Sequence, residues 1–524
     1  MKLRTIVKIA ITSSVVLLCS GFALYSFFRL SAAEGQKDFN LYELVPSTTS
    51  AVFVTDDVLE FVAEVDELTC SKNQQYLYVS KLFSYLKQSL YALSEDTPHG
   101  LSRQMNQMLI SFHEPDNERN QVLYCRLGNG DKELVNRFVR KYISSLYPPK
   151  TFIYKGEEII IYPMADGDFL ACYLTSDFMA LSFQKKLIEN VIDAYKSGKS
   201  LADDSTFTGI RAPKKSAAAA TIYTRMQGMM GWTEFDMKMK DDFIYFSGIT
   251  HDADTCFAFI NQLRQQQSVK GFPGEVLPST AFYFSRQGIT DWVSLLSYGN
   301  AQGQSVPART SEVQNRDKEF SRYLMENAGQ DLVACLFQRE DTLQDAAAVL
   351  SLSVADVTEA ERMLRALVNA ASADEGRRNP RITFCYTVNK AYPIYRLPQT
   401  TLFEQLTSFA EPTLDVYAAF YGGRLLLAPD ADALAHYIRQ LDKGEVLNGA
   451  MAYQTGMDHL SDSYHFMLMA DFDHIFQQSE NHVRFVPDFF LRNADFFRHF
   501  TLFVQFACAD GVVYPNIVLK YKSE

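Results

Sequence analysis

The sequence lacks the clusters of basic residues that a nucleic-acid-binding surface requires. Its 50 Lys and Arg are outnumbered by 62 Asp and Glu, which gives a formal net charge of −12. Because neutralising phosphates needs a Lys- and Arg-rich surface, this balance excludes nucleic acid as the expected partner. The chain is nevertheless rich in core-forming residues. Its 524 residues are 47% hydrophobic, enough for two to four domains.

Recognisable catalytic and cofactor motifs are also missing. The chain has no HExxH zinc motif and no GxSxG nucleophile motif. The stretch Ser197-Gly198-Lys199-Ser200 resembles the end of a phosphate-binding loop, but Asp193 stands where that motif needs its first glycine. A helix precedes it where the motif needs a strand, so Gly198 is predicted to end that helix. The sequence therefore predicts no catalytic, cofactor-binding or metal-binding residue, and no cofactor.

Cysteines are few and do not have the spacing of a disulfide framework or a metal site. Seven lie beyond the first thirty residues, an odd number, and none forms a CxxC pair. Cys125, Cys172 and Cys385 lie in strand-like apolar runs, where a thiol is expected to pack as a small buried hydrophobe. The chain also contains no N-x-S/T glycosylation site, which favours a bacterial envelope over a eukaryotic secretory route.

One long hydrophobic run stands near the N-terminus. Residues 1–8 form a basic stub, and residues 9–28 contain no charge. Twenty helical residues span about 30 Å, the thickness of the hydrocarbon core of a bilayer. The basic flank predicts a cytoplasmic N-terminus, with the bulk of the chain periplasmic and the inner membrane as a partner. The alternatives are a signal peptide cleaved near Ala32 or Ala33 and a lipoprotein signal at Cys19, the latter disfavoured by Leu18 before it.

The remaining chain contains an internal repeat. The phrase "LVPSTTSAVFV" at 44–54 returns as "VLPSTAFYFSR" at 276–286, and "TFIY" at 151–154 returns as "TFCY" at 383–386. A third block, 182–201, aligns without a gap on 428–447. Collinear matches at such a long period indicate two related domains and not a solenoid. We expect a first repeat domain at 40–270 and a second at 271–524, with 400–413 as an insertion in the second.

The predicted fold class is α+β, with two tandem related domains of largely antiparallel sheets and amphipathic helices after one N-terminal transmembrane helix. Several elements are predicted individually, and we list them here. They are strands at 51–55 and 282–285, a strand pair at 107–112 and 121–126, a four-stranded meander between 151 and 182, helices at 131–143 and 184–196, a helix opened by a capping box at Thr358–Glu361, a hairpin around Asp510, and exposed loops at 297–320 and 371–378.

Two groups of residues near the C-terminus raise alternatives. His459, His465 and His474, with Asp471 and Asp473, are residue types that can bind a divalent cation, but none has the i, i+4 spacing of a helical metal site. Partly buried single histidines are the commoner arrangement, so no metal site is predicted. The stretch "HVRFVPDFFLRNADFFRHF" at 482–500 fits either a partner-facing or lipid-facing surface or the core of an amphipathic helix, and the core is favoured.

The "LVPSTTSAVFV" phrase and the stretch from Ser182 through Gly198 to Phe207 also carry a family resemblance. Together with the N-terminal run, they resemble a family of membrane-anchored bacterial envelope proteins known from Bacteroides-like bacteria, built from a domain of unknown function. The second copy departs from this pattern, with Ala428 and Pro429 in place of Ser182-Phe183 and Tyr453 in place of Phe207. The resemblance implies no activity and no site residues.

The expected function is therefore that of a single-pass envelope protein whose ectodomain binds or scaffolds an envelope protein or lipid. The alternative is an envelope hydrolase or metal-dependent enzyme whose site residues come together only in the fold. A third hypothesis is a structural role in an assembly, with the aromatic residues of 482–500 as the contact. The sequence leaves the oligomeric state open.

Overall fold

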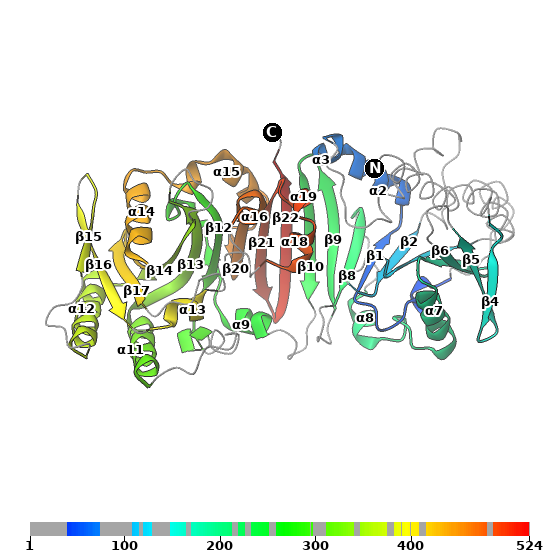
Figure 1. Cartoon of the computed structure of the whole chain (residues 1–524), viewed down its shortest axis with the longest axis horizontal. Helices are drawn as coiled ribbons and strands as arrows, with labels where there is room; N and C mark the ends of the chain where they lie inside the picture. The colour runs from blue at the N-terminus through cyan, green and yellow to red at the C-terminus, as the bar shows by residue number, and fades with distance from the viewer. Residues whose placement is uncertain are drawn as a thin grey trace. The chain divides into compact units, whose positions relative to one another are not determined.

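The computed structural model forms two compact units that divide between Cys256 and Phe257. Figure 1 labels the helices and strands of both units. The described residues are 39–73, 107–114, 119–127, 147–163, 169–211, 218–225, 232–250, 258–293, 295–296, 311–339, 346–374, 382–388, 390–398, 400–407, 415–478 and 486–522. The expected membrane helix at 9–28, the basic stub, the expected helix at 131–143 and Cys19 lie outside them.

Ten strands of the first unit form one antiparallel ladder. They are β1 Ala51–Thr55, β2 Met108–Phe112, β3 Gln121–Arg126, β4 Lys150–Tyr154, β5 Glu157–Pro163, β6 Phe169–Leu174, β7 Phe178–Ser182, β8 Ala220–Thr224, β9 Thr233–Lys240 and β10 Phe243–Thr250. Their order in the sheet is β4-β5-β6-β7-β3-β2-β1-β8-β9-β10. The predicted strand pair β2–β3 and the meander β4–β7 are confirmed.

The second unit repeats that order with its own strands. They are β12 Ala281–Gly288, β13 Ala328–Gln338, β14 Ala346–Val354, β15 Ile382–Tyr386, β16 Ala391–Pro398, β17 Asp415–Tyr421, β18 Arg424–Ala428, β20 Phe466–Asp471, β21 Phe500–Ala509 and β22 Val512–Tyr521. Their order is β15-β16-β17-β18-β14-β13-β12-β20-β21-β22. The short strands β11 (Val269–Lys270) and β19 (Ser463–Tyr464) pair separately.

Helices connect these strands and lie on the sheets. They are α2 Val58–Glu67, α3 Thr69–Lys72, α7 Lys185–Ser197, α8 Ser205–Ile210, α9 Ala258–Gln265, α11 Ser311–Asn327, α12 Val357–Asp374, α13 Leu402–Leu406, α14 Ala431–Asp442, α15 Met451–Met457, α16 Phe472–Phe476, α18 Asp488–Arg492 and α19 Ala494–Phe497, with 3-10 turns η1 Leu41–Leu44, η2 Pro273–Glu275 and η3 Leu447–Gly449. In the first unit α7 packs on β5, β6 and β7, and its apolar side joins η1 and the strands in one hydrophobic cluster. In the second unit α14 packs on β14, β17 and β18.

The ends of α7 and α14 are built alike. Gly198 follows α7 with φ +64°, and Gly444 follows α14 with φ +76°, a left-handed conformation that glycine adopts without steric cost. Just beyond each glycine the chain bridges back to the segment that leads into the sheet, Pro46 to Ser200 in one unit and Pro278 to Val446 in the other. The prediction that Gly198 ends a helix is confirmed.

The matched blocks "TFIY" and "TFCY" pair with their neighbouring strands in registers that are offset by one residue. Phe152 pairs with Ile159, whereas the residue in the corresponding place of the second unit, opposite Ile394, is Thr383. A shift of one residue moves every side chain of a strand to the other face. Phe152 therefore lies on the face covered by α7, and Phe384 on the face opposite α14.

The predicted fold class, α+β, is wrong, whereas the transmembrane helix expected with it falls on residues outside those that the structure describes. Strand is the commonest structure among the described residues, at 42% against 34% helix, and the strands form large antiparallel sheet. The alternation of short strands and helices along the chain was misleading, because the helices are connections laid over continuous ladders and not a separate layer of equal weight. In the described part of the chain, no helix is long and apolar enough to cross a membrane.

Two local predictions are also corrected. The expected exposed loop at 297–320 is helical over its last part, because α11 begins at Ser311 and buries Val313 and Phe320. The expected capping box at Thr358–Glu361 does not open α12. The carboxylate of Asp356 accepts the Glu359 N–H instead, so the cap lies two residues earlier.

Candidate functional site

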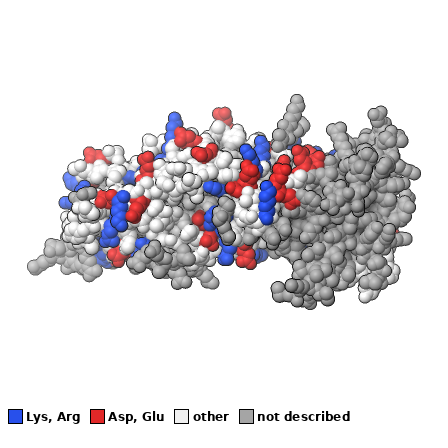
Figure 2. Space-filling model, turned by 90° about the horizontal axis from the view of Figure 1, so that it is seen from above, with Lys and Arg blue, Asp and Glu red and all other residues white. Residues whose placement is uncertain are grey.

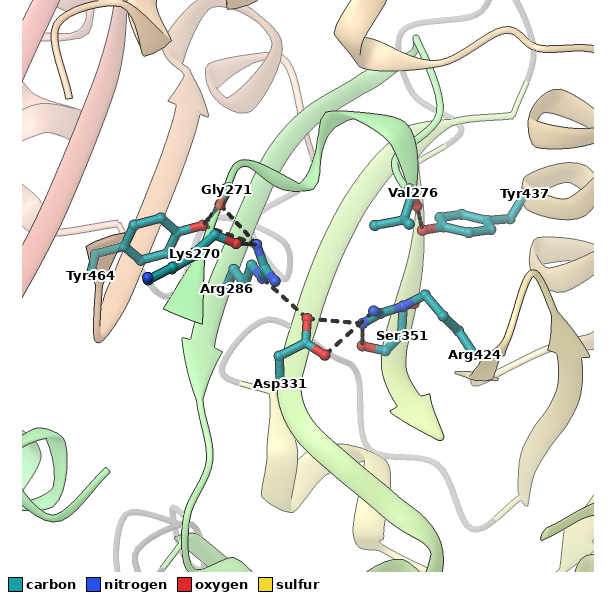
Figure 3. Close-up of polar contacts among 9 residues, drawn as sticks. All are labelled: Lys270, Gly271, Val276, Arg286, Asp331, Ser351, Arg424, Tyr437 and Tyr464. Atoms are coloured by element: carbon teal, nitrogen blue, oxygen red, sulfur yellow. Dashed lines mark hydrogen bonds and ion pairs between the residues drawn. The ribbon is translucent and has the colours of Figure 1, made fainter. Parts of the chain in front are cut away.

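A buried ionic network crosses the sheet of the second unit. Asp331 on β13 lies between Arg286 on β12 and Arg424 on β18 (Figure 3). The Nε of Arg286 donates to Asp331 over 3.1 Å, and both terminal nitrogens of Arg424 donate to the same carboxylate over 3.4 Å. Arg424 also donates to the hydroxyl and carbonyl oxygens of Ser351 on β14. Four neighbouring strands are thus joined by one group of charges.

Arg286 extends the network to the segment that precedes the sheet. Its Nη1 donates to the carbonyl oxygen of Gly271 over 2.9 Å, and Tyr464 donates to the same oxygen over 2.8 Å. Nearby, the hydroxyl of Tyr437 on α14 donates to the carbonyl oxygen of Val276 (Figure 3). These bonds fix the chain just before β12 against both the sheet and its covering helix.

The network has one carboxylate for two guanidinium groups. The side chains of Arg286, Arg424 and Asp331 are 16%, 14% and 9% exposed. Burial alone would raise the pKa of Asp331, but the charges of Arg424 and Arg286 and a hydrogen bond from Ser353 outweigh it and lower that pKa. Asp331 is therefore ionised at neutral pH, and the cluster carries a net positive charge.

The first unit has no such network at the corresponding positions. Phe178 opens β7 as Arg424 opens β18, and Val54 corresponds to Arg286 in the repeat. Phe178 packs instead on the rings of Phe39 and Tyr195, with centroids 4.8 and 5.4 Å away. The same strand order thus forms with rings at this place, so the fold does not require the charges.

The network joins neighbouring strands and has no arrangement suited to catalysis. Asp331 is held ionised by two cations, so it is a poor proton donor, and the network contains no nucleophile beside a base. Sequence reasoning missed these residues. The available signal was a single charge inside each apolar strand run, as in "FYFSRQG", "QDLVACLF" and "GRLLLA", because a lone buried charge requires a partner on a neighbouring strand.

The histidine and aspartate residues near the C-terminus form a pair and not a metal site. His474 Nδ1 lies 3.3 Å from one oxygen of Asp471, and Lys522 Nζ lies 2.6 Å from the other. The hydrogen bond to Asp471 raises the pKa of His474. The ring of His474 also stacks on Phe282 at 6.0 Å. With a lysine on the second oxygen, this carboxylate is already neutralised.

The other predicted metal candidates do not join this pair. His465 accepts the N–H of Cys508 through Nδ1, and Asp473 donates its own N–H to Asp471 as part of a helix cap. His459 lies just after α15. Among the described residues no three His, Cys, Asp or Glu side chains form a group that could hold a metal ion.

A serine and a histidine also meet inside the first unit. Ser111 Oγ lies 2.9 Å from His113 Nε2 and 3.0 Å from the hydroxyl of Tyr124. Burial lowers the pKa of His113 to about 4, so the ring is a weak base. Ser111 is fully buried, which keeps a substrate from its hydroxyl. This group is a buried hydrogen-bond chain and not a nucleophile with its base.

Three of the rings of 482–500 that the structure describes belong to the core, the arrangement favoured from the sequence. Phe496, Phe497 and Phe500 are buried, and Phe497 packs edge to face on Phe490 at 4.8 Å between centroids. Phe472 on α16 completes the cluster. The hypothesis that these rings form an assembly contact is not supported for the residues that the structure describes.

Exposed apolar residues gather instead at β15. Ile382, Phe384, Tyr386 and Val388 are 39%, 50%, 70% and 96% exposed, and we call these four the β15 strip. Ile382, Phe384 and Tyr386 alternate along the strand, so they share one face, and Val388 lies in the turn that follows it. In Figure 1 β15 lies at the end of the sheet of the second unit, and within the described residues it pairs only with β16. An edge strand with an apolar outer face is typical of a surface that binds another protein.

Charged residues of both signs are mixed on one face of the described part of the chain. On the face drawn in Figure 2, Lys and Arg are interspersed with Asp and Glu over the described residues.

No family model, no curated protein and no solved structure matches the chain.

Proposed function

We propose that the chain is a single-pass membrane protein of a bacterial cell envelope, and that its two units form a binding or scaffolding ectodomain. The support for the membrane tether is the uncharged run at 9–28 behind a basic stub. The support for binding is the β15 strip, since an exposed apolar edge strand that is paired on one side alone within the described residues favours association. An envelope protein or lipid is the proposed partner.

The identical strand order of the two units supports a related inference, that the ectodomain contains two copies of one antiparallel-sheet module. The paired left-handed glycines Gly198 and Gly444 and the two bridges beside them support the same inference. The ionic network has no counterpart at Phe178 and Val54, the corresponding positions of the first unit, so the proposed copies differ in side chains while sharing a strand order. The β15 strip belongs to the second unit, and we propose it as the binding surface.

The hydrolase alternative receives no specific support. It required the C-terminal histidines and aspartates to come together, and only Asp471 and His474 do so, with Lys522 on the same carboxylate. We do not propose it.

Purification from membranes tests the proposal. The tagged full chain is expressed in a bacterial host together with an untagged copy, and the proteins and lipids that purify with it, the untagged copy included, are compared with those of a Phe384→Ser/Tyr386→Ser variant. The matched control is Met451→Ser, because Met451 is an apolar residue of the same unit, 81% exposed, that lies away from β15. We expect partners shared by wild type and the control and lost from the variant.

Identical partners in all three samples would contradict the assignment of the β15 strip. A topology reporter at the C-terminus gives an independent check, because the proposal requires that end on the periplasmic side. A C-terminal reporter on the cytoplasmic side would contradict the proposal that the two units form an envelope ectodomain.

A further inference from the structure

We propose that the β15 strip binds the β15 strip of a second copy of this chain, as an added antiparallel strand. The inference rests on the proposed function and names the partner of that surface. It follows from the direction of the backbone groups, the symmetry of the sequence and the contrast with β4.

The backbone groups of the strip point away from the sheet. The N–H of Thr387 donates to the carbonyl oxygen of Lys390 across the β15–β16 hairpin, over 2.9 Å. Successive residues of an antiparallel strand direct their backbone N–H and C=O groups to opposite sides, so the backbone groups of Cys385 and Thr383 also point at β16. The backbone N–H and C=O groups of Ile382, Phe384 and Tyr386 therefore point away from the sheet. The same residues thus offer apolar side chains together with strand-edge hydrogen-bonding groups that have no backbone partner in the part of the chain that the structure describes.

The strand is complementary to itself. Antiparallel pairing about a two-fold axis at Phe384 places that ring opposite its own copy, and places Ile382 opposite the second copy's Tyr386. Ile382–Tyr386 contains no charge. This matters because a two-fold axis brings each residue near its own copy, where like charges would repel.

The corresponding edge strand of the first unit, β4, also exposes an apolar side chain, Ile153 at 71%, but its rings on the other face are engaged by α7. Lys185 on α7 lies 5.1 Å from the centroid of the Phe152 ring on β4. The hydroxyl of Tyr154, also on β4, donates to Asp193 on α7 over 3.0 Å. Lys155, which follows the strand, forms an ion pair with Asp193 at 2.7 Å. A charge beside an edge strand is a common protection against pairing. In the second unit Ala431 and Arg439 stand in the places of Lys185 and Asp193, so neither contact can form at β15, and we assign the contact to β15 and not to β4.

A five-residue strand gives a small interface, well below the roughly 1,600 Å² of a standard protein–protein complex. Membrane tethering compensates, because chains confined to one surface meet at a much higher effective concentration. We therefore expect self-association of the full chain in membranes and weak association of the detached ectodomain.

Cross-linking at the symmetry axis tests the inference. In the full chain in membranes, Phe384→Cys places two thiols opposite each other, about 5 Å apart between Cβ atoms. A short bismaleimide is expected to yield a product of twice the chain's mass. Met451→Cys, on a more exposed site of the same unit, and the wild type, which reports on the native cysteines, are expected to yield none.

A second variant separates strand pairing from chance collision. Tyr386→Pro in the Phe384→Cys background removes an outward N–H and leaves every β15–β16 hydrogen bond in place. We expect the cross-linked product to fall about tenfold, as the loss of one to two hydrogen bonds predicts, with unchanged thermal unfolding.

The outcomes distinguish this inference from the proposed function. A Phe384→Cys product with a different envelope protein would overturn self-pairing and leave the binding function standing. Equal yields from Phe384→Cys and Met451→Cys, or an unchanged yield with Tyr386→Pro, would overturn self-pairing. No product with any protein, together with unchanged partners of the Phe384→Ser/Tyr386→Ser variant, would overturn both.

Discussion

The carboxylate of Asp331 accepts a hydrogen bond from Arg286 at 3.1 Å on one side while Arg424 donates to it from the other. Two largely buried cations therefore depend on one anion. Asp331→Asn removes that anion and leaves the guanidinium groups facing each other. We expect a loss of about 3–5 kcal/mol in the free energy of unfolding of the second unit, measured by urea denaturation.

Asp415→Asn is the matched control for this prediction. The two carboxylate oxygens of Asp415 accept hydrogen bonds from Nε and Nη2 of Arg396 on the neighbouring strand. The side chain of Asp415 is, however, 35% exposed. Because solvent screens such a pair, we expect a loss of about 1 kcal/mol or less. Equal losses in the two variants would show that burial does not set the importance of the Asp331 network.

His113 is expected to make the first unit sensitive to acid. Burial lowers the pKa of His113 in the folded chain to about 4, below its ordinary value of 6.5. As the pH falls from 6.5 toward 4, the unfolded state takes up a proton that the folded state does not, so the stability falls over that range. The effect is at most about 3 kcal/mol. His113→Phe, which introduces the residue of the corresponding position Phe337, is expected to flatten the stability profile between pH 6.5 and 4; an unchanged profile would contradict the assignment.

His474 is expected to act in the opposite direction. Its hydrogen bond to Asp471 raises the pKa of His474 above the ordinary 6.5, although burial and Lys522 oppose this shift and Asp473 adds to it. A raised folded pKa contributes stability that is complete below pH 6.5 and is lost as the pH rises through the folded value. His474→Gln should remove this loss, so the thermal midpoints of wild type and variant should converge above the folded pKa. Parallel curves from pH 6 to 9 would contradict this prediction.

Phe497 and Phe384 distinguish a core ring from a surface ring. Phe497 is 5% exposed and contacts Phe472, Phe490 and Phe496, whereas Phe384 is 50% exposed. Phe497→Ala should lower the free energy of unfolding by about 3–5 kcal/mol through the cavity it leaves. Phe384→Ala should change it by about 0.5 kcal/mol or less and lower association instead. Urea denaturation and cross-linking yield, measured on both variants, provide the comparison.

Elements with strong local signals were predicted correctly from the sequence. The hairpin around Asp510, the strand pair at 107–126 and the helix ended by Gly198 all depend on turn chemistry and periodicity that neighbouring residues determine. The burial of the rings in 482–500 was also favoured correctly. These properties need no knowledge of distant parts of the chain.

The other properties depend on pairing between segments far apart in the sequence. Arg286, Asp331 and Arg424 look like isolated charges until β12, β13, β14 and β18 are placed side by side. The fold class was wrong for the same reason, because the number of strands that join one ladder is decided by long-range register. The helix from Ser311 was missed because its first turns are polar and it buries only a few residues against α12 and α13.

The offset between "TFIY" and "TFCY" has one more consequence. Sliding a strand along its neighbour by one position exchanges its covered side chains for its uncovered ones. Two units with the same strand order can therefore expose different side chains from nearly identical strand sequences.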